Sequence, residues 1–235
     1  MHYIPYLSTL VTFAFTAAVF RRYLQRRGPH LLIWSIGLLG YGLGTLSEVI
    51  LGLTFSAAVV KLWYLAGAMI SAAWLGQGTF HLLVRRRGLA WTVTGVLAAV
   101  SLLATVLIAL EPVQGGTYQV SQPISSQYQA VLARSGLVIA LTIILNIYGS
   151  ITMVGGALYS AFIFWRKHIL FQRMIGNILI AAGALAPAIG GSFVRAGLPD
   201  FLYLTELVGA ILMYIGFVQA TVPAPAQAAS PVPSN

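Results

Sequence analysis

Seven long apolar runs dominate this chain, and short stretches rich in arginine, glycine or proline separate them. Each run is close to the roughly 20 residues that a helix needs to cross the hydrocarbon core of a bilayer. The pattern predicts an all-α, polytopic membrane protein whose seven helices form one bundle over residues 1–221. The predicted spans are residues 4–20, 31–53, 59–84, 89–110, 137–165, 169–194 and 201–221.

Two segments fall outside this pattern. Residues 111–135 are rich in Gln, Ser, Gly and Tyr, and they form the one sizeable connection between predicted spans. Residues 222–235 consist largely of Ala, Pro and Ser and cannot bury an apolar core, so we expect them to be a disordered tail.

The distribution of basic residues orients the predicted bundle. Positively charged loops stay on the cytoplasmic side of a membrane. The rule predicts an N-terminus outside, a cytoplasmic C-terminus and tail, and an extracytoplasmic loop at residues 111–135. Ten basic residues follow the first, third and fifth spans, namely Arg21, Arg22, Arg26, Arg27, Arg85, Arg86, Arg87, Arg166, Lys167 and Arg173, against three on the other side, Lys61, Arg134 and Arg195.

Composition excludes several functions. Only 7% of residues are charged and 59% are hydrophobic, whereas a soluble domain carries roughly 25% charged residues. The net charge of +9 lies in short loops between spans, so we expect no nucleic-acid partner. The absence of cysteine excludes disulfides and thiolate chemistry. No catalytic, nucleotide-binding or metal-binding motif is present, which predicts a protein that is not an enzyme.

Two glutamates lie inside predicted spans, and each shares a helix face with small residues. Small residues four apart allow a second helix to approach closely, so both acids are expected to face the bundle interior. An ionisable group in that position is a functional-site hypothesis. The helix-packing glycines are Gly37, Gly40 and Gly44 beside Glu48, and Gly209 and Gly216 beside Glu206.

Both glutamates fall near the outer end of the bundle, where Lys61, Arg134 and Arg195 are predicted at similar depth. One interpretation is a ligand pocket or ion path at the mouth of the bundle. The other is a set of buried or snorkelling salt bridges that fix helix register. The candidate ligand-binding residues are Glu48, Lys61, Tyr64, Arg195, Tyr203 and Glu206.

Few residues in the sequence are candidates for binding a cofactor. The predicted seventh span contains no lysine, which argues against a covalent retinal pigment. His81 is best explained as an interfacial residue, with axial binding of a haem or pigment as its alternative role. Trp63 and other tryptophans near span ends are expected to form an interfacial aromatic belt. We therefore predict no cofactor and no metal.

The chain resembles the seven-transmembrane N-terminal sensor region of bacterial histidine kinases. The resemblance rests on the basic loop after the first span, on Glu48 near the end of a small-residue-rich second span, and on the sequence KLWYLAG at residues 61–67 before a basic cluster. Those sensor regions continue into a cytoplasmic output domain, whereas here a short tail follows. The resemblance implies a sensor-like module of a prokaryotic plasma membrane that acts through a partner protein.

Three functions follow from these observations. The first is a non-catalytic, receptor-like module that binds a small or lipidic ligand in its outward-facing mouth and acts through a partner membrane or signalling protein. The second is an accessory subunit of a larger membrane complex, with lipid, quinone or pigment between its helices. The third is a proton- or cation-coupled transporter that uses the glutamates.

Overall fold

The computed structural model describes residues 3–84, 86–120, 122–167 and 171–221. The side chains of Arg87 and Arg195 and the predicted tail at residues 222–235 lie outside this description. Within it, seven helices are long and apolar enough to cross a membrane, which confirms the predicted all-α membrane fold. They cover Ile4–Arg26, Pro29–Leu51, Ala57–Leu83, Gly88–Leu110, Gly136–Arg166, Phe171–Val194 and Asp200–Ala220.

Two of the spanning helices change their hydrogen-bonding pattern part of the way along. The third contains the π-helix η1 and the fifth contains the π-helix η3, so each is divided into three labelled segments. The elements are α1 (Ile4–Arg26), α2 (Pro29–Leu51), α3 (Ala57–Leu62), η1 (Trp63–Ile70), α4 (Ser71–Leu83), α5 (Arg87–Leu110), η2 (Gly115–Thr117), α6 (Ile124–Val131), α7 (Gly136–Ser150), η3 (Ile151–Gly155), α8 (Gly156–Arg166), α9 (Phe171–Arg195) and α10 (Asp200–Ala220).

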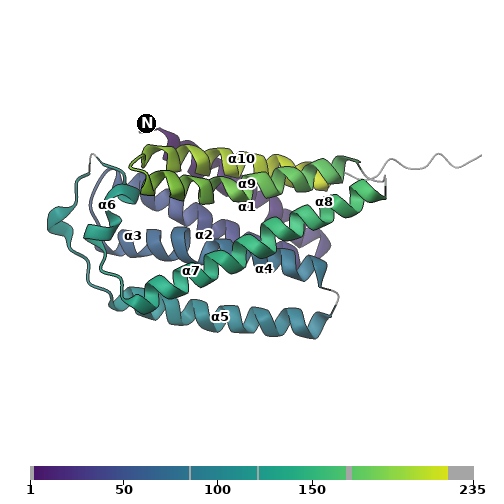
Figure 1. The fold of residues 1–235 in the computed structure, drawn as a ribbon, viewed down its shortest axis with the longest axis horizontal. Coiled ribbons are helices and arrows are strands. Elements are labelled where there is room, and N and C mark those ends of the chain that lie inside the picture. Colours follow the sequence, from purple (N-terminus) through teal and green to yellow (C-terminus); the bar gives the residue numbers. More distant parts are fainter. Residues whose placement is uncertain (1–2, 85, 121, 168–170, 222–235) are drawn as a thin grey trace, which may run out of the picture.

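Contacts between the spanning helices close a ring, and helix α5 lies apart along one side of the bundle (Figure 1). Around the ring, α1 packs on α2, α2 on η1 and α4, α4 on α7, α8 on α9, and α9 on α10, which returns to α1. The continuous helix α7–η3–α8 runs diagonally, so its first half packs on α4 and its second half on α9. Helix α5 lies outside the ring, against α4, α7 and η1.

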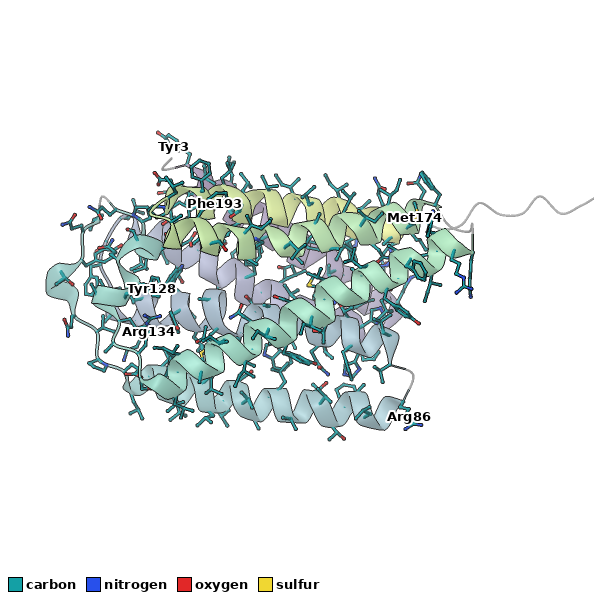
Figure 2. The ribbon with its side chains drawn as sticks, viewed as in Figure 1. Tyr3, Arg86, Tyr128, Arg134, Met174 and Phe193 are labelled. Carbon is teal, nitrogen blue, oxygen red and sulfur yellow. The ribbon has the colours of Figure 1, made fainter. Side chains whose placement is uncertain are left out.

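The two ends of the bundle differ in structure and charge. We call the end that holds residues 111–135 the α6 end, and the opposite end, where α1 finishes in Arg21–Arg26, the basic end. Figure 2 shows Tyr128 and Arg134 at the α6 end and Arg86 at the basic end. At the basic end, Arg22 Nη2 donates a hydrogen bond to the Thr221 carbonyl oxygen at 3.0 Å and so joins α1 to the last turn of α10.

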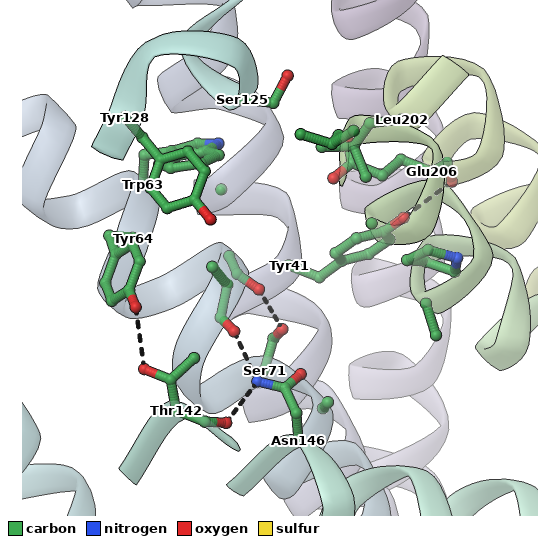
Figure 3. Close-up of a pocket in the computed structure, with 18 of the residues that line it drawn as sticks. Tyr41, Trp63, Tyr64, Ser71, Ser125, Tyr128, Thr142, Asn146, Leu202 and Glu206 are labelled. Carbon is green, nitrogen blue, oxygen red and sulfur yellow. Dashed lines mark hydrogen bonds between the residues drawn. The ribbon is translucent and has the colours of Figure 1, made fainter. Parts of the chain in front are cut away.

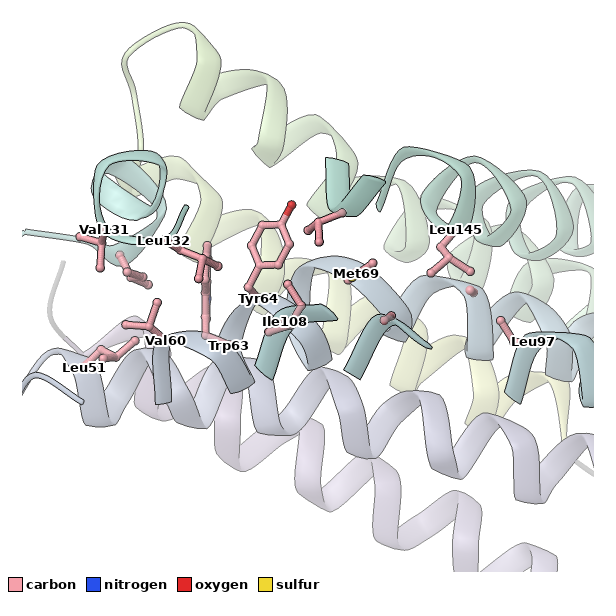
Figure 4. Packing of buried hydrophobic residues seen from close by; sticks show 14 residues of the cluster. Leu51, Val60, Trp63, Tyr64, Met69, Leu97, Ile108, Val131, Leu132 and Leu145 are labelled. Atoms are coloured by element: carbon pink, nitrogen blue, oxygen red, sulfur yellow. The ribbon is translucent and has the colours of Figure 1, made fainter. Parts of the chain in front are cut away.

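The segment at residues 111–135 is folded against the helices. Val131 and Leu132 are fully buried, and they belong to the same apolar cluster as Leu51, Val60 and Trp63 (Figure 4). The predicted loop therefore contains a short helix, α6, and contributes to the core at this end of the bundle.

Hydrogen bonds also tie this segment to the spanning helices. The Glu111 carboxylate accepts a hydrogen bond from the Ser135 backbone N–H at 2.7 Å, where α7 begins. Hydrogen bonds from the Ser135 side chain and backbone, together with the charge of Lys61, hold the pKa of Glu111 below its ordinary value. The ends of α5 and α7 are thus fixed beside each other.

Glycine contacts allow two helix pairs to approach closely. A Cβ on Gly44 of α2 would lie 2.6 Å from the Cα of Gly67 in η1, so only hydrogen fits there. Between α9 and α10, a Cβ on Gly183 would lie 2.6 Å from the Gly209 carbonyl oxygen, and one on Gly216 would meet the Gly176 carbonyl oxygen at the same distance. Small residues at helix contacts are the usual basis of tight packing in membranes.

We expect Gly44→Ala to destabilise the protein by about 1–3 kcal/mol, because the added methyl group must push α2 away from the η1 backbone. Thermal unfolding of the purified protein measures this. The control is Gly95→Ala in α5, where a Cβ meets nothing within 4 Å and alanine favours the helix. Equal midpoints for both variants would contradict the close α2–η1 contact.

Candidate functional site

A cavity of about 1130 Å³ lies inside the α6 half of the ring. Its walls come from α2, η1, α4, α6, α7, η3, α9 and α10. Figure 3 shows Trp63, Tyr64 and Tyr128 on one side of this cavity and Tyr41, Leu202 and Glu206 on the other. The cavity exists because α7 leaves the ring diagonally and α9 packs on η3 and α8 rather than on α7.

Exposed lining residues place one opening of the cavity between α7 and α9. Ile143 and Ile147 line it from α7 and are 52% and 54% exposed. Ala188 and Ser192 line it from α9 and are exposed as well. Because both helices span the membrane, this opening faces the region that lipid occupies. A hydrophobic molecule can therefore reach the cavity from within the bilayer.

Both π-helices border the cavity, through Tyr64 and Gly67 in η1 and through Met153 in η3. A π-helix shifts the backbone hydrogen bonds and leaves carbonyl groups that need other donors. Side chains meet this need in η1, where Asn146 Nδ2 donates to the Ala68 carbonyl oxygen at 2.8 Å and Ser71 Oγ donates to the Gly67 carbonyl oxygen at 2.8 Å. The irregular backbone thus places polar groups on the cavity wall, as π-helices at functional sites often do.

Glu48 and Glu206 meet at the cavity wall. Glu48 is 4% exposed, and its Oε1 accepts a hydrogen bond from the Trp63 indole N–H at 3.0 Å. The two carboxyl groups lie within hydrogen-bonding reach of each other. The Oε2 atom of each is buried and has no hydrogen-bond partner among the described residues. Two charged carboxylates in contact here would repel each other strongly, whereas a proton shared between them would satisfy both.

Two tyrosines support this carboxyl pair. The Tyr41 hydroxyl of α2 donates to the Glu206 backbone carbonyl oxygen of α10 at 2.9 Å, which joins the two helices directly (Figure 3). Tyr203, one turn before Glu206, is 8% exposed and lies beside both carboxyls. The acids therefore sit in an aromatic and mostly buried setting, not in open solvent.

Arg134 lines the cavity near the start of α7. Its guanidinium carbon lies 4.7 Å from the centre of the Tyr128 ring and 5.8 Å from that of Tyr64. Tyr64 in turn shares a hydrogen bond with Thr142 at 3.2 Å. The rings hold the guanidinium by cation–π attraction and fix its position at the α6 end of the cavity.

The structure brings some of the predicted site residues together and separates others. Glu48, Tyr64 and Glu206 line the cavity, whereas Tyr203 is buried one turn before Glu206 and does not line it. Lys61 points elsewhere, because its Nζ donates to the Ala109 carbonyl oxygen of α5 at 2.6 Å. The side chain of Arg195 lies outside the described residues.

Sequence reasoning missed Trp63 as a partner of Glu48 and assigned it to an interfacial belt, whereas its side chain is only 6% exposed. A signal was present in the sequence. The turn at residues 54–56 joins two antiparallel helices, and Glu48 and Trp63 lie nearly the same number of residues before and after it. Residues so placed in a helical hairpin come to the same depth.

His81 lies outside the cavity, in a polar network near the basic end. Its Nε2 shares a hydrogen bond with Thr94 Oγ1 at 2.7 Å, and its ring packs against Trp91. Gln77, which is fully buried, donates to Thr94 at 2.8 Å and accepts from the Tyr148 hydroxyl. Axial binding of a haem or pigment through His81 Nε2 would have to break the contact with Thr94.

The sequence matches no family description, and it matches neither curated proteins nor solved structures.

Two substitutions of Glu48 test whether its hydrogen bond with Trp63 and its contact with Glu206 stabilise the fold. Glu48→Gln keeps an oxygen for the Trp63 N–H and gains an amide donor for Glu206, so we expect a thermal midpoint close to that of the wild type. Glu48→Ala leaves two buried groups without partners, each costing about 1–3 kcal/mol, so its midpoint should be clearly lower. Alanine and glutamine variants of equal stability would show that the pair does not form.

Proposed function

We propose that this chain is a non-catalytic, receptor-like membrane protein that binds a small amphipathic or lipidic ligand in the cavity and acts through a partner protein. The observation that carries the proposal is the cavity of about 1130 Å³ with its opening between α7 and α9. Ligand pockets in proteins are typically about 300–1,000 Å³. This cavity therefore has room for a ligand with an apolar chain.

The chemistry of the walls supports this class of ligand. Most of the side chains along α7 and α9 are aliphatic, including Ile139, Ile143, Ala184 and Pro187. Polar groups stand between these apolar stretches, among them the carboxyl groups of Glu48 and Glu206, Asn146, Arg134 and several serine and threonine hydroxyls. A largely apolar cavity with a few placed polar groups is the usual form of a small-molecule site.

The positive-inside rule supports an outward-facing α6 end, because the arginine-rich loops lie at the opposite end of the bundle. The cavity would then open near the outer surface of the membrane. Together with the resemblance to histidine kinase sensor regions, this supports a sensor-like role in a prokaryotic plasma membrane. A ligand would be detected from the outer leaflet, and a cytoplasmic or membrane partner would receive the signal.

The arrangement of the helices suggests how ligand binding could change the structure at the basic end. A ligand between α7 and α9 sets the separation of these helices in the α6 half of the bundle. Helix α7–η3–α8 is continuous, and α8 packs on α9 in the other half. A change in the tilt of this helix therefore alters the α8–α9 contact near the predicted cytoplasmic surface.

The carboxyl pair favours one second candidate, a proton- or cation-coupled transporter in which Glu48 and Glu206 exchange their shared proton. This candidate predicts pH-dependent uptake into vesicles that Glu48→Gln and Glu206→Gln each abolish. Flux that is unchanged in both variants removes it.

The proposed binding function is tested with hexadecanol that carries a photoreactive diazirine in its chain, added to the protein in nanodiscs. We expect crosslinks to residues that line the cavity. Gly191 lines the cavity and has open space at its Cβ position, so Gly191→Leu should fill the cavity without a clash and lower this labelling several-fold.

The control is Gly155→Leu, which also extends into open space but does not line the cavity, and its labelling should match the wild type. Mass spectrometry of the crosslinked peptides gives the sites. Labelling that is confined to the outer surface of the bundle, or that is unaffected by Gly191→Leu, would contradict the proposal.

A further inference from the structure

We propose that the ligand of this cavity is a single-chain amphiphile with an anionic head, whose carboxylate or phosphate group binds Arg134 and whose chain lies between α7 and α9. This inference rests on the proposed binding function and specifies its ligand. It follows from the placement of one cation, from the charges around it and from the direction in which the cavity opens.

The Arg134 side chain is positioned to bind an anion. The Tyr128 and Tyr64 rings lie against its guanidinium group, at 4.7 Å and 5.8 Å from the guanidinium carbon. No guanidinium N–H of Arg134 donates a hydrogen bond to any residue in the described part of the chain. The planar group is therefore oriented by aromatic packing while its donors stay free for a ligand, and this geometry suits carboxylate and phosphate oxygens.

The described acids do not neutralise Arg134. Glu111 is the nearest acid in sequence on the N-terminal side, and its carboxylate is held by the Ser135 N–H at 2.7 Å without forming an ion pair with Arg134. Glu48 accepts a hydrogen bond from Trp63, and neither Glu48 nor Glu206 forms an ion pair with Arg134 among the described residues. Within the described residues, the cavity thus has an unpaired positive group at its α6 end.

The depth of Arg134 matches a lipid head group. It lies two residues before α7 begins at Gly136, so it is at the edge of the membrane-spanning region. From there the cavity continues along Ile139, Ile143 and Ile147 toward the opening between α7 and α9. An amphiphile that enters from the bilayer can keep its head at this depth while its chain replaces lipid contacts along α7.

A cationic head at the carboxyl pair is the competing arrangement. It would require both carboxyl groups to be charged, which their burial and mutual repulsion oppose. Binding at Arg134 breaks no hydrogen bond among the described residues. The geometry therefore favours an anionic head.

The experiment compares two photoreactive probes with the same chain, palmitate and hexadecanol, each with a diazirine at mid-chain, on the protein in nanodiscs. We expect palmitate to bind at least about tenfold more tightly, because only its carboxylate forms a charged, bidentate pair with the guanidinium group. Arg134→Gln should remove this preference, so that the two probes label the cavity to a similar extent. A thermal unfolding midpoint close to that of the wild type shows that the variant is folded.

Two further variants and one competitor complete the test. Arg134→Lys should keep part of the preference, since it retains the charge but loses the planar geometry. Lys61→Gln removes the same charge at the same end of the bundle without lining the cavity, so its preference should match the wild type. Excess inorganic phosphate should fail to displace palmitate, whereas displacement would show a site for a free anion and would contradict the lipid proposal.

The outcomes separate the two proposals. Equal binding of palmitate and hexadecanol in the cavity, unaffected by Arg134→Gln, would overturn the anionic head and leave the binding function intact. Tighter binding of the matching hexadecyl amine would overturn it in favour of the carboxyl pair. If none of the probes labels the cavity, the proposed function itself fails.

Discussion

The contact between Glu48 and Glu206 is the constraint on which the rest of this bundle depends. Two carboxyl groups inside apolar helices are tolerated only if each finds partners. Here the Trp63 indole N–H donates to Glu48 of α2 and the Tyr41 hydroxyl donates to the backbone of Glu206 in α10, so α2, η1 and α10 meet around the two acids. Gly44 and Gly67 make this possible, because their backbones approach closely enough to bring Trp63 against Glu48.

The backbone of the third spanning helix is irregular near this meeting point, and this irregularity contributes to the cavity wall. The third spanning helix becomes a π-helix over Trp63–Ile70, and its displaced carbonyl groups take hydrogen bonds from Asn146 and Ser71. Asn146 belongs to α7, so this bond also holds α7 against the η1 side of the ring. Helix α9 stays with α10 through the glycine contacts. The ring therefore opens between α7 and α9, and the polar groups that hold it together become the polar groups of the cavity.

Much of this architecture could be predicted from the sequence, because membrane-spanning helices and their packing faces impose recognisable residue patterns. Apolar length and the basic loops specify the seven spans, and glycine spacing marks the packing faces of α2 and α10. Helix α1 continues to Arg26, beyond the predicted limit of the first span at residue 20, since arginines end an apolar run without ending a helix. Hydropathy measures the environment of a segment, while helix ends depend on backbone geometry, here the left-handed conformation of Arg27 before Gly28 and Pro29.

The site was harder to predict because it depends on which helices are neighbours. The depth of Glu48 and Glu206 follows from their positions in the sequence, but their contact requires α2 and α10 to be adjacent. Lys61 is predicted at the same depth and yet points to α5, because depth does not specify which face of the bundle a side chain takes. Arg134 and Tyr128 come together only when residues 111–135 fold back over the helices. The diagonal path of α7, which creates the cavity, leaves no periodic signal in the sequence.

An experimental structure of the protein in lipid nanodiscs, prepared without added ligand, tests the account most directly. The account predicts elongated non-protein density inside the α6 half of the ring, entering between α7 and α9, with its polar end at the Arg134 guanidinium group and with Glu48 against Trp63 and Glu206. A structure in which α7 packs on α9 along its whole length, so that no cavity remains, would contradict it.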